Sequence, residues 1–153
     1  YSYDFLVNEL CNEVEALDPI TYDRIFQEKS IEVVSKLLKI KSSEEEVLQD
    51  LYIIILASTM ADGKVTMEEY LPSQKLFKSF FGETITFEKI NKYLKSMKKE
   101  TNELKDLADK IVDGYGELDS GLKTDICFIC LLICAVDGDI SIKERKWLKK
   151  LLA

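Results

Sequence analysis

Hydrophobic residues recur every three or four positions along nearly the whole chain, which is typical of amphipathic helices. The first stripe covers residues 2–17. Asp18 and Pro19 end it and open a second helix that continues to about residue 40, because proline fits the first turn of a helix. The chain has only two prolines and six glycines, and no strand-like alternation persists. The pattern predicts an all-α, single-domain bundle of about seven or eight helices.

Local signals place the other helices. Ser43 followed by Glu46 predicts a capping box at the start of a helix over residues 43–61, since the serine hydroxyl accepts the amide three residues on. A helix after Thr66 ends at Gly82, and further apolar stripes lie within residues 90–97, 104–115, 122–136 and 142–152. A loop is predicted before the stripe that begins at 122, because three glycines punctuate the chain there: Gly114, Gly116 and Gly121.

One pattern occurs twice and organises the chain. Residues 51–61 are mostly apolar and lead into Asp62-Gly63-Lys64-Val65 and then Thr66 to Glu69. Residues 126–136 are fully apolar and lead into Asp137-Gly138-Asp139-Ile140 and then Ser141 to Glu144. Self-similarity of this kind indicates a repeated structural unit. The sequence therefore predicts two pseudo-repeated helix–Asp-Gly loop–helix units.

Backbone chemistry explains much of each loop. Gly63 and Gly138 lie just past a helix end, where glycine tolerates the left-handed backbone. The segments 66–69 and 141–144 both fit capping boxes. Asp62 and Asp137 differ, because an acid at the negative end of a helix costs roughly 0.3–1 kcal/mol. Two explanations stay open: the carboxylates accept loop amides in Asx-turns, or they bind a cation.

A bound divalent cation would be the cofactor under the second explanation. The second loop is the better candidate, because it has Asp139 where the first loop has Lys64. An EF-hand is excluded: with Gly138 at loop position six, positions one and three become Ile133 and Ala135, which cannot coordinate calcium. The candidate metal ligands are Asp62, Glu69, Asp137, Asp139 and Glu144.

Composition narrows the classes of function. The net charge is −7 and the chain has no histidine. Nucleic-acid binding is set aside because no basic stripe is present. The commonest zinc ligand and general base are both missing, so histidine-dependent catalytic triads are excluded and no enzymatic activity is expected. The longest apolar run, residues 126–136, is too short for a membrane span, which needs about 20 residues.

The cysteines favour a reducing compartment. Cys127, Cys130 and Cys134 share one helical face, a spacing at which thiolates could hold a soft ion. They lie within the apolar run, however, so we interpret them as core residues with little reactivity. Together with Cys11 they form no secreted disulfide framework, and a cytoplasmic location is expected. The sequence starts at Tyr1 without methionine, so it can be part of a longer protein.

The repeated motif resembles the TerB-like family, named for tellurite resistance. The resemblance covers residues 47–152, while residues 1–41 would add a helical extension packed on a TerB-like domain of residues 42–153. It implies a small bacterial all-helical module with no established enzymatic activity, associated with stress and tellurite resistance. It also implies that the motif acids are metal ligands; these fall on Asp62, Glu69, Asp137 and Glu144. Lys64 and Pro72 depart from the pattern in the first copy.

Two functions remain from the sequence. The first is a TerB-like module that binds a cation through its Asp-Gly loops in a stress-related role. The alternative is an acidic protein–protein interaction or scaffold domain in which the same loops only cap helices. Both functions imply a protein partner. The sequence identifies neither this partner nor the oligomeric state.

Overall fold

The computed structural model describes residues 3–41, 43–59, 101–135 and 139–153. Their regular structure is entirely helical, which confirms the all-α class for this part of the chain. The predicted helices within 66–81 and 90–97, the first Asp-Gly loop and the predicted total of seven or eight helices involve residues outside it. Six helices are described: α1 (Tyr3–Glu15), α2 (Pro19–Ile40), α3 (Glu44–Thr59), α6 (Thr101–Leu118), α7 (Ser120–Cys134) and α8 (Ile142–Leu152).

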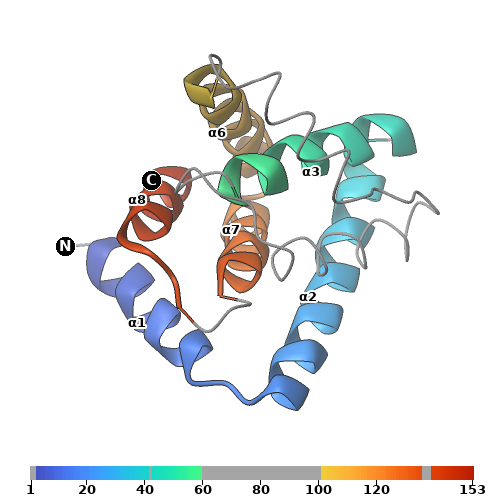
Figure 1. The fold of residues 1–153 in the computed structure, drawn as a ribbon. Coiled ribbons are helices and arrows are strands. Elements are labelled where there is room, and N and C mark those ends of the chain that lie inside the picture. Colours follow the sequence, from blue (N-terminus) through green and yellow to red (C-terminus); the bar gives the residue numbers. More distant parts are fainter. Residues whose placement is uncertain (1–2, 42, 60–100, 136–138) are drawn as a thin grey trace, which may run out of the picture.

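Helix α7 lies at the centre of the molecule (Figure 1), and α2, α3, α6 and α8 all pack against it. Nine of its fifteen residues are buried, including the whole stretch from Ile129 to Cys134. A helix that is apolar on every side is stable in water only when other elements cover every side. The central position of α7 therefore follows from its sequence.

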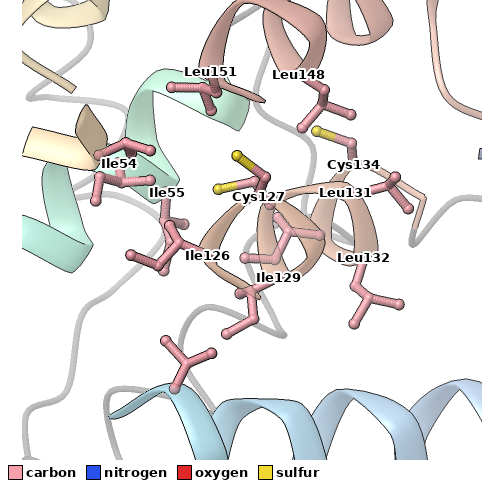
Figure 2. Close-up of a cluster of buried hydrophobic side chains, with 14 of the residues drawn as sticks. Ile54, Ile55, Ile126, Cys127, Ile129, Leu131, Leu132, Cys134, Leu148 and Leu151 are labelled. Carbon is pink, nitrogen blue, oxygen red and sulfur yellow. The ribbon is translucent and has the colours of Figure 1, made fainter. Parts of the chain in front are cut away.

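The core forms where α3 and α8 meet α7. Figure 2 shows Ile54 and Ile55 of α3, and Leu148 and Leu151 of α8, in one cluster with the side chains of α7. Ile54 and Ile129, which match in the predicted repeat, are both buried. The helix expected after the first Asp-Gly loop lies outside the described residues, so the twofold repeat stays a prediction. The division of the chain at residues 41 and 42 also stays a prediction, although α2 packs on both α3 and α7.

Helix starts follow the predicted capping signals. The Asp18 carboxylate accepts the amide of Thr21 at 2.9 Å, and Pro19 is the first residue of α2. The Ser43 hydroxyl accepts the amide of Glu46 at 3.3 Å at the start of α3. Each such cap is worth about 1 kcal/mol. Helix α8 has the predicted bounds, whereas α1 ends two residues earlier than predicted.

The predicted glycine loop is wrong. Helix α6 continues through Gly114 and Gly116 to Leu118, and α7 begins at Ser120 after the single residue Asp119. Burial of Val112 and Tyr115 on the same helix outweighs the low helix propensity of glycine. Gly116 has a packing role, because a Cβ atom there would lie 3.0 Å from Cδ and 3.1 Å from Cβ of Lys123. Its missing side chain lets α7 approach the end of α6.

Polar side chains join the helices at a few buried or partly buried points. The Trp147 indole of α8 donates to the Ser58 hydroxyl of α3 at 3.0 Å, and that hydroxyl donates to the carbonyl of Ile54 at 2.9 Å. The Tyr115 hydroxyl of α6 donates to the Asp50 carboxylate of α3 at 2.6 Å, and Lys41 binds the same carboxylate at 2.8 Å. These bonds satisfy groups that would be costly to bury unpaired.

The two glycines of α6 should respond oppositely to alanine. Gly114→Ala should raise the free energy of unfolding by about 0.5–1 kcal/mol, because alanine is the better helix former and nothing lies within 4 Å of the new Cβ. Gly116→Ala should lower it, since Lys123 and α7 must move. Urea unfolding followed by circular dichroism measures both. Equal gains would show that the close approach at Gly116 has no energetic role.

Candidate functional site

The structure describes two of the five predicted metal ligands. Asp62, Glu69 and Asp137 lie outside the described residues. Asp139 is exposed just before α8, and Glu144 lies in the first turn of α8 with only 3% of its surface exposed. The structure therefore tests only the last part of the second Asp-Gly loop.

Glu144 takes part in the predicted capping box. Its Oε1 atom accepts the amide of Ser141 at 2.8 Å, and the Ser141 hydroxyl accepts the amide of Glu144 at 3.1 Å. The carboxylate lies at the helix N-terminus, where the helix dipole favours a negative charge. This arrangement gives the buried acid a structural role that needs no metal.

A second group of polar contacts ties α1 to the same segment. The amide of Ile140 donates to Oε2 of Glu15 at 2.7 Å, and Nη2 of Arg145 pairs with Oε1 of Glu15 at 2.9 Å. Nε of Arg145 also donates to the carbonyl of Ile140 at 3.1 Å. We call Glu15, Ile140 and Arg145 the α1 clasp. Here a guanidinium binds a carboxylate and a backbone carbonyl, the oxygen ligands that a hard cation would also use.

No sequence pattern marks the α1 clasp. Glu15 is the last residue of α1, and Arg145 lies near the start of α8. The two residues lie at opposite ends of the chain, so no local spacing could have linked them. Short-range spacing along the chain reveals only the capping box of Ser141 and Glu144.

Groups of acids or thiols that could hold a metal do not occur within the described residues. No three histidine, cysteine, aspartate or glutamate side chains lie close enough together there. All four cysteines are buried, and none of these four described residues forms a disulfide. Burial raises the pKa of Cys127 well above its ordinary value and that of Cys130 to about 11. The interpretation of these thiols as core residues is confirmed.

A partly open pocket of about 240 Å³ lies between α1, α7 and α8, with one residue of α2 at its edge. Its walls are mainly apolar, and Leu6 at the rim is 46% exposed, so the pocket reaches the surface. No sequence pattern marks this pocket, because a leucine beside a pocket and a leucine in a packed core follow the same periodicity.

Comparisons of the chain with models of known protein families, with curated proteins and with solved structures found no match. The resemblance to TerB-like proteins thus depends on the repeated motif alone. Each helix in the described ranges is too short or too polar to cross a membrane.

Two substitutions separate the cap from the charge at Glu144. Glu144→Gln should leave the free energy of unfolding nearly unchanged, because glutamine can also accept the Ser141 amide in a capping box. Glu144→Ala should lower it by about 1 kcal/mol through loss of that bond. Thermal and urea unfolding of both variants measure the difference. Equal losses would mean that the negative charge, and not the cap, is what the position requires.

Thiol reactivity tests the burial of α7. Iodoacetamide at pH 8 should modify Cys127 and Cys130 far more slowly in the native protein than in urea, because burial blocks access and the raised pKa values leave little reactive thiolate. Peptide mass spectrometry over time gives a rate for each residue. Rapid native modification would contradict the packing of α7.

Proposed function

We propose that this protein is a non-enzymatic helical interaction module, TerB-like in organisation, in which the second Asp-Gly segment is a structural joint. The burial and hydrogen bonding of the motif acid Glu144 support this proposal most directly. Its carboxylate is buried and bound to the Ser141 amide. The neighbouring Arg145 supplies a positive charge from the protein itself through the α1 clasp.

The reactive side chains that the protein has, and those that it lacks, support a binding role over catalysis. The chain has no histidine, its thiols are buried, and burial raises the pKa of three of them, Cys11, Cys127 and Cys130. A reactive cysteine needs the opposite environment, with exposure and a lowered pKa. The net charge of −7 favours a basic partner, because complementary charge speeds association and suppresses wrong partners.

The rival to this proposal is a cation site built from the motif acids, including Asp137. Calorimetric titration of chelator-treated protein with calcium, magnesium, manganese and zinc separates the two. We expect no saturable heat with any ion, because an Asx-turn can satisfy the loop carboxylates without one. The titrations are repeated on Asp137→Asn, and any effect of this change should appear in thermal stability alone.

Asp119→Asn is the matched control, because Asp119 caps α7 and was not predicted to bind metal. Saturable binding that Asp137→Asn abolishes and Asp119→Asn retains would overturn the structural role and favour the cation-binding module. Circular dichroism of each variant confirms that a silent titration comes from folded protein.

A further inference from the structure

The pocket between α1, α7 and α8 has a polar end and an apolar end. Thr124 and Asp125 begin the part of α7 that lines it, and Leu131 ends that part. At 1.5 Å per residue, the two ends lie about 10 Å apart along the helix. Thr124 is exposed, whereas Leu131 is only 3% exposed, so the polar end faces solvent and the apolar end lies inside.

Apolar side chains from three helices form the inner walls. Val7 of α1 is 3% exposed and Leu148 of α8 is 2% exposed, and both line the pocket with Leu131. Apolar walls favour an apolar ligand group over water, because binding removes apolar surface from water. The volume of about 240 Å³ lies below the range of pockets for drug-sized ligands, about 300–1,000 Å³. A slender alkyl chain fits these limits better than a fused-ring cofactor.

The charges at the polar end are balanced. Asp125 binds Lys29 and Lys36 at 3.3 Å each, and Glu32 binds the same two lysines at 3.3 and 3.5 Å. An anionic ligand would leave an uncompensated negative charge in a protein of net charge −7. A cationic ligand would have to compete with two lysines for Asp125. An uncharged head group adds no charge to this end of the pocket and does not compete with the lysines for Asp125.

Lys29 can still bind a ligand. An ammonium group has three donors, of which Asp125 and Glu32 take two, and a carboxylate offers about four lone-pair sites. The Lys29 ammonium also lies 5.8 Å from the ring centroid of Phe128, a contact weak enough for its third proton to serve a hydroxyl group instead. The same hydroxyl can donate to a remaining acceptor site on Asp125. Lys36 keeps Asp125 paired if Lys29 turns toward the ligand.

We propose that this pocket binds a single-chain amphiphile with an uncharged hydroxyl head. The alkyl chain lies among Val7, Leu131 and Leu148, and the hydroxyl lies between Lys29 and Asp125. The site is separate from the Asp-Gly segment and does not depend on the proposed interaction role.

Binding of octanol, octanoate and octylammonium to the full chain tests the head group. Ligand-observed NMR titrations should give saturable binding of octanol, with weaker binding of the two charged analogues. No saturable binding of octanol would overturn the proposal. Octanoate or octylammonium bound as tightly as octanol would overturn the assignment of an uncharged head.

Matched variants test the location. Leu10→Trp should fill the pocket and weaken octanol binding at least about tenfold, whereas Leu38→Trp, at another partly buried leucine outside the pocket, should not. If Leu10→Trp unfolds, Leu6→Trp replaces it, with Leu107→Trp as control, since these leucines are 46% and 45% exposed. Equal binding in the pocket variant and its control would place octanol elsewhere.

Two lysine variants test the hydrogen bond to the head. Lys29→Met should weaken octanol binding about fivefold to tenfold, the usual effect of one lost hydrogen bond. Lys36→Met removes a similar ion pair to Asp125, but Lys36 does not line the pocket, so it should leave the affinity unchanged. Equal effects would show that Lys29 acts only through Asp125, which would contradict direct contact with the ligand.

Discussion

Burial of α7 is the constraint on which the described structure depends. From Ile126 onward this helix has no face that favours water, so each side must be covered by another helix. Coverage comes from α2, α3, α6 and α8, and α3 in addition packs directly on α2, α6 and α8. Dense apolar packing of this kind supplies most of the stability of a small domain.

Polar contacts then fix how the covering helices are placed. Hydrophobic burial is not directional, whereas a hydrogen bond between two side chains sets both distance and angle. Trp147 and Ser58 fix α8 relative to α3, and Asp50 with Tyr115 fixes α3 relative to α6. The α1 clasp does the same for α1, whose main packing partner is α8. Ile140, at the end of the second Asp-Gly segment, belongs to this set, since Glu15 of α1 binds its amide and Arg145 of α8 binds its carbonyl.

The sequence predicted what depends on neighbouring residues. Periodicity located the helices, and Asp18, Ser43 and Ser141 marked helix starts because caps act over three residues. Gly114 and Gly116 misled the prediction, because packing across α6 and α7 decides the conformation there and spacing along the chain does not show it. The α1 clasp and the pocket could not be predicted from the sequence for the same reason. Of the candidate metal ligands, the sequence correctly identified Glu144 as a capping residue, while its role as a ligand stays untested.

The packing of α1 on α8 has a consequence for synthesis of the chain. The thirteen residues of α1 are made before the eleven residues of α8, which form the surface they pack on and follow more than a hundred residues later. Until α8 has left the ribosome, α1 has neither its apolar contacts nor Arg145 to bind Glu15. Contacts between helices so far apart in the chain form slowly, so we expect α1 to dock on α8 late in folding.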